Sequence, residues 1–349
     1  MKTVRVGDRV VGEGEPALLT AEAGINHNGD IKLAHQLVDA AANAGADAVK
    51  FQNYRTEDFV TDRTLTYKYV VQGREVVEKQ YDMFKRCELT LQSLKELRKQ
   101  CADRNLIFFS TPTNEKGVQD LVDLGAPLLK NGSDFLQNSS LIRAMARTHL
   151  PTVISTGMAT LAEIEKAVKT FRQAGGVDLI LLVCTSSYPT PPEETHLRRI
   201  PTLISATGCP VGFSDHTEGH AAALGAISLG ACMIEKHFTV DKSMPGPDHW
   251  FSADPHDFSL LAKNVRLLEK ELGNPEIRPT KSEIERRNEF RLSCLAGRNL
   301  KAGIELHESD ITFGRPGTGV PPDRKDSLKG RKLRRALTAG QVIDPSDLL

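Results

Sequence analysis

Eight short apolar runs recur along this 349-residue chain, and each run ends in polar residues before a helix-like segment follows. Eight strand-helix repeats of this kind specify a (β/α)8 barrel, whose strands all end at one mouth. We therefore expect the polar ends to converge on a site. In chain order they are Glu22, Lys50 with Gln52, Ser110 with Thr111, Lys130 with Ser133, Ser155 with Thr156, Thr185 to Tyr188, Ser214 to His216, and Glu235 to His237.

The predicted strands are continuous apolar runs, as expected when helices cover a parallel sheet. They are residues 17–21, 48–51, 106–109, 127–129, 152–154, 179–183, 211–213 and 232–234. A hairpin over residues 4–11 precedes them, and we expect it to close the bottom of the barrel. The loop over residues 53–87 is long, polar and dotted with aromatic residues, which is typical of a lid or a substrate wall.

The chain is longer than one barrel requires, and its character changes near residue 274. We predict a (β/α)8 TIM barrel over residues 1–275, a charged linker over 276–291 and a small β-rich domain over 292–349. A domain of that size lies near the lower limit for folding alone, so we expect it to lean on something larger.

Composition narrows the class of protein. Lys and Arg number 45 and Asp and Glu number 45, so the sequence carries no general basic footprint for nucleic acid. Apolar stretches are too short for a membrane span, and the N-terminus lacks a signal-peptide core, so we expect a cytoplasmic protein. The six cysteines are scattered without a C-x-x-C pair, which predicts reduced thiols.

His216 and His237 follow the seventh and eighth strands, which are neighbours in a barrel. Both imidazoles can then point into the mouth and share a divalent metal. The alternative is that they are ordinary polar residues at strand ends. Two protein ligands favour a water-rich Mn²⁺ or Mg²⁺ site over structural zinc.

Lys50, Lys130 and Lys236 also follow apolar runs, and they admit two interpretations. Several lysines together with hydroxyl groups suit a phosphate or a carboxylate. Alternatively, one lysine forms a Schiff base with a carbonyl substrate. Three cations in one mouth favour anion binding. Glu22, at the end of the first strand, is an acid/base candidate, and Asp248 lies in a loop that borders the mouth.

Ten short strings occur in order along the chain, mostly at strand ends: AEAGINHNG, VKFQ, STP, KNGS, STGM, CTSSYPTP, GFSDHT, EKHFT, GPDH and RPGTG. Together they closely resemble the sialic acid synthase family, and the last part resembles that family's antifreeze-like (SAF) domain. The resemblance implies condensation of phosphoenolpyruvate with an N-acetylated hexosamine, N-acetylmannosamine, to give a nine-carbon sialic acid and phosphate.

The resemblance also implies roles for particular residues. It makes His216 and His237 the metal ligands, and with the strand-end chemistry it points to four catalytic residues: Glu22, Lys50, Lys130 and Glu235. The remaining assignments concern substrate binding. They are Gln52, Thr111, Ser133, Ser155, Ser186, Tyr188, Ser214, Asp248 and Arg315. Ser186 departs from the family, which often has a longer asparagine there.

The resemblance implies a domain-swapped homodimer in which Arg315 of one subunit reaches the sugar bound by the other. Three alternatives remain open. The sugar could be 2,4-diacetamido-2,4,6-trideoxymannose, which would give legionaminic acid. The barrel could be a Schiff-base aldolase, or the chain could be a carbohydrate- or ice-binding module, which would need neither the histidine pair nor the lysines.

Overall fold

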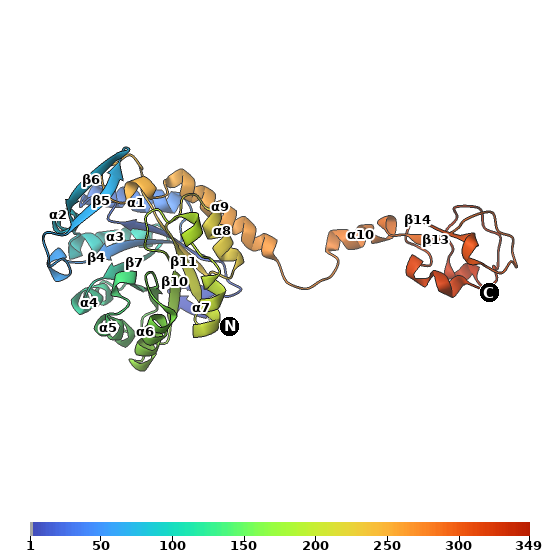
Figure 1. The fold of residues 1–349 in the computed structure, drawn as a ribbon, viewed down its shortest axis with the longest axis horizontal. Helices are drawn as coiled ribbons and strands as arrows, with labels where there is room; N and C mark the ends of the chain where they lie inside the picture. Colours follow the sequence, from blue (N-terminus) through green and yellow to red (C-terminus); the bar gives the residue numbers. More distant parts are fainter. Residues whose placement is uncertain (1–2) are drawn as a thin grey trace. The chain divides into compact units, whose positions relative to one another are not determined.

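The computed structural model describes residues 3–349 and divides the chain into two compact units, Met1–Gly273 and Asn274–Leu349. The first unit is a closed barrel of eight parallel strands, which confirms the predicted fold (Figure 1). The strands neighbour one another in chain order, and the last pairs with the first. They are β3 (Leu18–Gly24), β4 (Ala48–Asn53), β7 (Ile107–Pro112), β8 (Leu129–Asn131), β9 (Thr152–Ser155), β10 (Leu179–Val183), β11 (Val211–Asp215) and β12 (Met233–His237).

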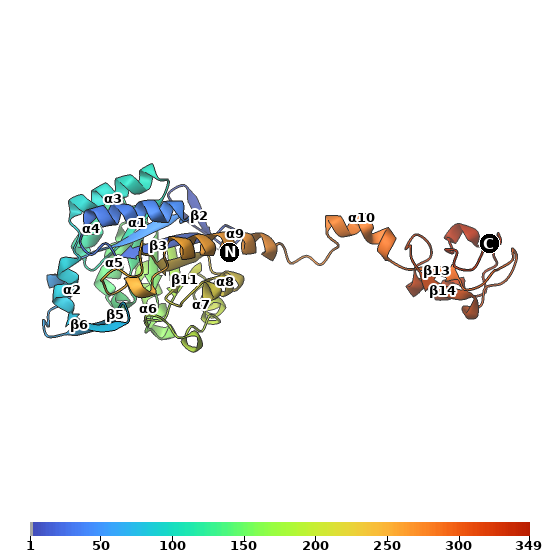
Figure 2. The same cartoon turned by 90° about the horizontal axis from the view of Figure 1, so that it is seen from above.

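Helices surround the barrel on its outside (Figures 1 and 2). Side-chain caps fix several of their starts: Asp30 accepts from Lys32 N, and Thr160 and Asp254 form capping boxes. The helices of the barrel are α1 (Ile31–Asn43), α3 (Leu91–Asp103), α4 (Glu115–Asp123), α5 (Ser139–Arg147), α6 (Leu161–Gln173), α7 (Arg199–Thr207), α8 (Ala221–Ser228) and α9 (Pro255–Leu272).

Strand register places the polar strand ends side by side. His237 on β12 pairs with Glu22 on β3, and Glu22 pairs with Lys50 on β4. Ser214 on β11 pairs with Glu235 on β12. Because neighbouring strands of a parallel sheet share one direction, these residues meet at the same end of the barrel.

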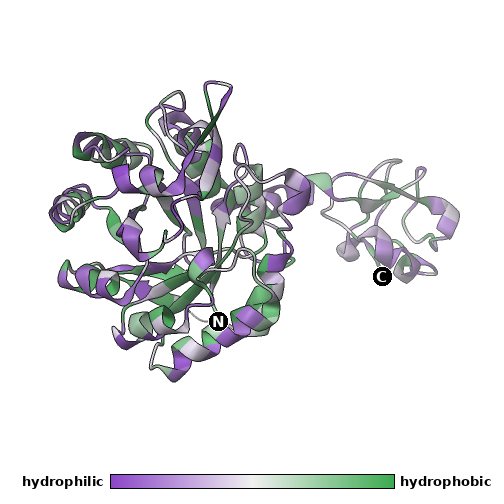
Figure 3. Cartoon of the chain, turned by 60° about the vertical axis from the view of Figure 1, so that its left-hand side comes forward, coloured by the Kyte–Doolittle hydropathy of each residue, from purple (hydrophilic) through white to green (hydrophobic). Residues whose placement is uncertain are grey.

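Two apolar layers hold the barrel. One joins the outer faces of the strands to the inward faces of the helices, and the other fills the barrel interior. The strands are mostly hydrophobic, and the surrounding helices alternate between hydrophobic and hydrophilic segments (Figure 3). The predicted hairpin is β1 (Thr3–Val6) with β2 (Arg9–Gly12). Its Val4, Val6 and Val11 pack against the interior layer, so the hairpin closes the bottom of the barrel.

The segment between β4 and α3, expected to be a long loop, has regular structure. It contains a short 3₁₀ helix (Thr56–Asp58), the antiparallel hairpin β5 (Thr66–Val71) and β6 (Arg74–Lys79), and α2 (Gln80–Arg86). Gln72 and Gly73 both have positive φ and form the two-residue turn that joins the strands. We call residues 54–87 the insertion.

The second unit has its own apolar core, which includes Cys294, Leu306, Leu333 and Ile343. It begins with α10 (Lys281–Phe290), which buries no residue, and contains one antiparallel pair, β13 (Ser293–Ala296) with β14 (Ile311–Gly314). Isolated bridges and 3₁₀ turns make up much of the rest.

Two smaller expectations concern the whole chain. All six cysteines are free and buried, in agreement with the predicted reduced thiols. Across residues 3–349, no helix is both long enough and apolar enough to cross a bilayer.

Candidate active site

A cavity of about 370 Å³ opens at the carboxyl ends of the barrel strands. Every residue of the barrel to which the sequence assigned a catalytic, substrate-binding or metal-binding role lines it. These are Glu22, Lys50, Gln52, Thr111, Lys130, Ser133, Ser155, Ser186, Tyr188, Ser214, His216, Glu235, His237 and Asp248. The structure therefore brings together residues that lie more than 200 positions apart in the sequence, as the strand-end pattern predicts.

Four buried charged side chains, which we call the charged floor, lie at the base of this cavity: Glu22, Lys50, Lys130 and Glu235. Lys50 Nζ lies 2.8 Å from Glu22 Oε1 and 3.7 Å from Glu235 Oε1. Lys130 Nζ lies 3.6 Å from Glu235 Oε1 and donates to Ser155 Oγ at 2.7 Å. Both lysines thus lie within 4 Å of the Glu235 carboxylate, and Lys50 also pairs with Glu22.

Burial and neighbouring charges set the protonation of the charged floor. Burial raises the pKa of Glu22, and the negative charge of Glu235 adds to this against the opposing effect of Lys50. Burial lowers the pKa of Lys130, which Glu235 only partly offsets. For Lys50 the charges of Glu22 and Glu235 outweigh burial and raise its pKa. Glu22 and Lys130 are therefore the floor residues whose protons are most easily exchanged.

Two histidines stand beside the charged floor, with ring centroids 5.5 Å apart. His216 Nδ1 lies 2.7 Å from the carbonyl oxygen of Thr185, which can only accept, so Nδ1 carries the proton and Nε2 keeps its lone pair. Nδ1 of His237 is buried without a hydrogen bond and lies 3.6 Å from Asp248 Oδ2. Both histidines therefore have a ring nitrogen that could bind a ligand.

The surroundings of this pair fit a divalent cation. Burial lowers the pKa of both histidines, so they are neutral, as metal ligands must be. Glu235 Oε2 and Glu22 Oε2 are also buried without hydrogen bonds. Among residues 3–349, no group of three or more His, Cys, Asp or Glu side chains is arranged around a common metal position. A cation held by the pair would need water or substrate as further ligands.

Small polar groups lie close together on the side of the cavity formed by the carboxyl ends of β8, β9 and β10 and the residues that follow them. Ser133 Oγ accepts from Gly157 N at 3.0 Å and lies 3.1 Å from Cys184 Sγ. A Cβ atom at Gly157 would come within 2.5 Å of Ser186 Oγ and 2.7 Å of Ser133 Oγ. Gly157 therefore keeps open a space that is bordered by two hydroxyl groups and the thiol. Ser186, which departs from the family pattern, takes part in this arrangement.

Lys236 does not line the cavity, so its expected place among the lysines of the mouth is wrong. It donates to Asp215 Oδ2 and to Thr217 O, both at 2.8 Å. Successive side chains along a strand point to opposite faces, so Glu235 and His237 point into the cavity while Lys236 points away from it. The Lys236–Asp215 pair instead joins β11 to β12, and each member precedes one of the two histidines by one residue in the sequence.

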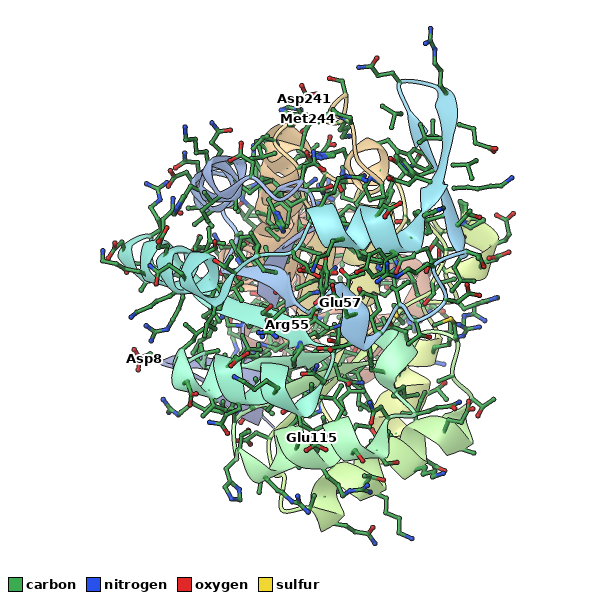
Figure 4. The ribbon with its side chains drawn as sticks, turned by 90° about the vertical axis from the view of Figure 1, so that its left-hand side faces the viewer. Asp8, Arg55, Glu57, Glu115, Asp241 and Met244 are labelled. Carbon is green, nitrogen blue, oxygen red and sulfur yellow. The ribbon has the colours of Figure 1, made fainter. Side chains whose placement is uncertain are left out.

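The insertion contributes cavity residues that the sequence did not single out. We call six of the cavity residues the apolar wall: Ile25, Tyr54, Phe59, Tyr67, Met83 and Phe84. Only the length and aromatic content of residues 53–87 pointed to this wall. Figure 4 labels Arg55 and Glu57 at the start of the insertion, and Asp241 and Met244 in the loop after β12. Gln72 Nε2, at the hairpin tip, donates to Ser243 O in that loop at 3.1 Å.

Arg315 belongs to the second unit. Its Nε donates to Phe290 O at 3.1 Å, and its guanidinium carbon lies 5.0 Å from the centre of the Phe290 ring. The side chain is exposed. Its role at the sugar, and the domain-swapped dimer that this role requires, stay predictions.

Comparison with known proteins identifies the family. Residues 37–277 match the NeuB family, and residues 295–349 match the SAF domain. The chain belongs to the NeuB family. The SAF match agrees with the resemblance of the C-terminal part to an antifreeze-like domain.

Related proteins align with the chain over most of its length. It is 41% identical to an uncharacterized protein of Methanocaldococcus jannaschii, over 100% of this chain and 99% of that one. It is 37% identical to the N,N'-diacetyllegionaminic acid synthase of Legionella pneumophila, over 95% and 94% of the two chains. Among solved structures it resembles the N-acetylneuraminic acid synthetase of Leptospira borgpetersenii, with a TM-score of 0.74 and 33% identity over 83% and 97% of the chains.

Proposed function

We propose that this NeuB family member condenses phosphoenolpyruvate with an N-acylated hexosamine and releases a nine-carbon sugar acid and phosphate. The observation that carries the proposal is the charged floor, where two buried lysines share carboxylates beside two neutral histidines. Relatives named as synthases of legionaminic acid and of N-acetylneuraminic acid support it.

The lysines of the charged floor suit the triply charged phosphoenolpyruvate. Lys130 and Lys50 supply positive charge in a site shielded from water, where charge interactions are strong. Ser133, Ser155 and Ser186 add hydroxyl donors on the same side of the cavity. In this arrangement the phosphate and carboxylate are held by the floor, and the methylene carbon faces the space left for the sugar.

The reaction forms one carbon-carbon bond and breaks one carbon-oxygen bond. The methylene of phosphoenolpyruvate attacks the aldehyde carbon of the open-chain sugar, and the aldehyde oxygen takes up a proton. Water adds to the resulting cationic C2 and loses a proton. The tetrahedral intermediate then expels phosphate and leaves a ketone. We propose that Glu22, whose pKa burial raises, carries a proton between these steps.

We propose that His216 and His237 hold a divalent ion, Mn²⁺ or Mg²⁺. Bound there, it would act as a Lewis acid toward the sugar aldehyde. The two neutral rings and the unpartnered Nδ1 of His237 support this assignment. Asp248, 3.6 Å from that atom, and Gln52, which donates to Glu22 at 3.2 Å, are then available to sugar hydroxyl groups.

One observation favours a second chemistry. Burial lowers the pKa of Lys130, as a Schiff-base nucleophile requires. Borohydride added with substrate would trap such an enzyme covalently, and a chelator would leave it active. The condensation predicts the opposite result in both experiments.

The test is phosphate release from phosphoenolpyruvate in the presence of candidate hexosamines. The panel contains N-acetylmannosamine, the first expectation from the sequence, and 2,4-diacetamido-2,4,6-trideoxymannose, the alternative. We expect phosphate release that depends on the sugar and is abolished by EDTA. If none of the sugars in the panel led to phosphate release, the proposal would be contradicted.

A further inference from the structure

The chain continues beyond Glu22 into a turn over residues 25–29, which we call the asparagine turn. Its two asparagines, Asn26 and Asn28, have no role in the site described so far, although both lie in the first of the ten strings. The side chain of Asn26 is buried, and a buried amide needs hydrogen-bond partners. The partners of these two side chains therefore show what the turn holds.

Asn26 joins the asparagine turn to both ends of the loop over residues 238–252, which we call the β12 loop. Its Nδ2 donates to the carbonyl oxygen of Phe238 and to Ser252 Oγ, both at 2.9 Å. Phe238 directly follows His237, and Ser252 is the last residue of the loop. A single amide nitrogen thus fixes both ends of the β12 loop against the turn.

Ser252 carries this connection on to Asp248. The Ser252 hydroxyl donates to Asp248 O at 2.6 Å, while its oxygen accepts from Asn26. Asp248 in turn has its Oδ2 atom 3.6 Å from His237 Nδ1. Asn26 is therefore connected to both members of this pair, to His237 through the next residue and to Asp248 through one hydroxyl group.

Asn28 attaches the asparagine turn to the middle of the β12 loop. Its Nδ2 donates to Pro245 O at 2.8 Å and lies 3.2 Å from His249 Nε2. A Cβ atom at Gly246 would come within 2.8 Å of Asn28 Oδ1 and 2.6 Å of His249 Cδ2. The absence of a side chain at Gly246 therefore lets the loop approach the turn closely.

We infer that Asn26 is a positioning residue, which sets the place of Asp248 relative to His237 by holding both ends of the β12 loop. Asn26 does not line the cavity, so it acts through these two residues and not on a substrate. A backbone hydrogen bond from Ala253 N to His237 O also closes the loop, so the loop does not depend on Asn26 alone. The inference rests on the proposed function, in which His237 binds the metal and Asp248 the sugar.

The experiment measures two constants for the full chain and its variants. Calorimetry gives the dissociation constant for Mn²⁺, and steady-state kinetics at saturating phosphoenolpyruvate gives KM for a hexosamine that supports turnover. Asn26→Leu removes both connections, so both constants should rise about 10- to 100-fold, as when outer partners of metal ligands are lost. Ser252→Ala removes only the branch to Asp248. It should raise KM for the sugar about 2- to 10-fold, the effect of one hydrogen bond, and leave Mn²⁺ binding within about twofold.

The matched control is Thr207→Val on α7. Thr207 is buried outside the cavity, and its hydroxyl donates to Leu203 O at 2.8 Å. The variant therefore also loses one buried hydrogen bond to a carbonyl oxygen, but both constants should stay within about twofold of those of the unaltered chain. Chemical denaturation of each variant separates a change in stability from a change in position.

Unchanged constants in both Asn26→Leu and Ser252→Ala would overturn the inference, and so would an equal rise of KM in Thr207→Val. If Asn26→Leu does not fold, Ser252→Ala decides, because an unchanged KM for the sugar in that variant contradicts the connection to Asp248. Failure of the proposed function differs from these outcomes, since the unaltered chain would then neither bind Mn²⁺ nor release phosphate.

Discussion

The charged floor and the apolar wall line one cavity but come from different parts of the fold. Floor residues stand on barrel strands: the register pairs Glu22 with Lys50, and the side chains of Lys130 and Glu235 meet across the barrel interior. Most wall residues come from the insertion, where a hairpin and α2 pack over the mouth. The difference suggests a division of labour, because a rigid barrel can hold reacting groups while the insertion adapts the cavity to one sugar.

Removing a proposed metal ligand should give the largest loss of activity if the barrel holds the reacting groups. His216→Ala should lower turnover at least about 1,000-fold, because loss of a Lewis acid removes several kcal/mol of transition-state stabilisation. Calorimetry with Mn²⁺ should show that binding is lost as well. The control is His149→Ala, a change to a histidine outside the cavity, which should keep both properties. Metal-independent activity near that of the unaltered protein in His216→Ala would refute the assignment.

Substituting a buried lysine outside the cavity should mainly reduce stability, whereas substituting a buried lysine of the charged floor should mainly reduce activity. Lys236→Met leaves Asp215 buried without its partner, so the free energy of unfolding should fall by about 3–5 kcal/mol. Chemical denaturation measures this loss. The double change with Asp215→Asn should recover part of the stability, because the unpaired charge is gone. Unchanged stability in Lys236→Met would mean that the pair does not hold β11 to β12.

Lys130→Ala should damage catalysis more than stability. We expect kcat/KM for phosphoenolpyruvate to fall about 100- to 1,000-fold, the effect of removing one preorganised charged donor. The Michaelis constant for the sugar should change little. Lys68→Ala, an exposed lysine paired with Glu75 on the hairpin, is the control and should be nearly neutral. If only the Michaelis constant for the sugar rises, Lys130 belongs to the sugar site, and the two substrates bind in places opposite to those proposed.

Stability should also depend on pH through two histidines near the mouth. Burial lowers the pKa of both His27 and His249 to about 4. His249 Nε2 faces the donor Asn28 Nδ2 at 3.2 Å, so protonation there would break a hydrogen bond. Both rings are neutral in the fold, whereas the unfolded chain binds protons below its ordinary pKa of 6.5.

The stability due to these neutral rings is therefore complete above pH 6.5 and is lost as the pH falls toward 4. Each histidine should contribute about 3 kcal/mol to the loss. Denaturant unfolding measured from pH 7 to pH 4 gives the slope, and His249→Gln should reduce it. His196→Gln, a change outside the cavity at a ring with no such partners, should leave it unaltered.

Much of the charged floor could be predicted from the sequence. In a barrel, a charged residue at the end of a short apolar run is expected to lie at the carboxyl end of a strand, where the cavity is. Glu22, Lys50 and Lys130 were predicted on that ground and line the cavity. Lys236 was misplaced because the same pattern was applied to three consecutive residues, although side chains alternate along a strand. With Glu235 and His237 facing inward, Lys236 had to face outward.

The residues of the apolar wall could not be predicted from the sequence, for a different reason. Met83 and Phe84 sit on a seven-residue helix, and the place of Phe84 at the cavity depends on tertiary packing against Tyr54 and Phe59. No strand-end rule applies within the insertion. Gln72 and Gly73 form the turn between its strands with positive φ, but Gln-Gly is not one of the dipeptides that mark such a turn in a sequence.

The central claim is that phosphoenolpyruvate reacts through its methylene carbon at the charged floor and loses phosphate by cleavage of the bond between C2 and oxygen. The direct measurement uses phosphoenolpyruvate labelled with ¹⁸O at the bridging oxygen, together with a hexosamine that supports turnover. Mass spectrometry of both products then locates the label. We predict that all of the label leaves with phosphate, and label retained in the sugar acid would contradict the account.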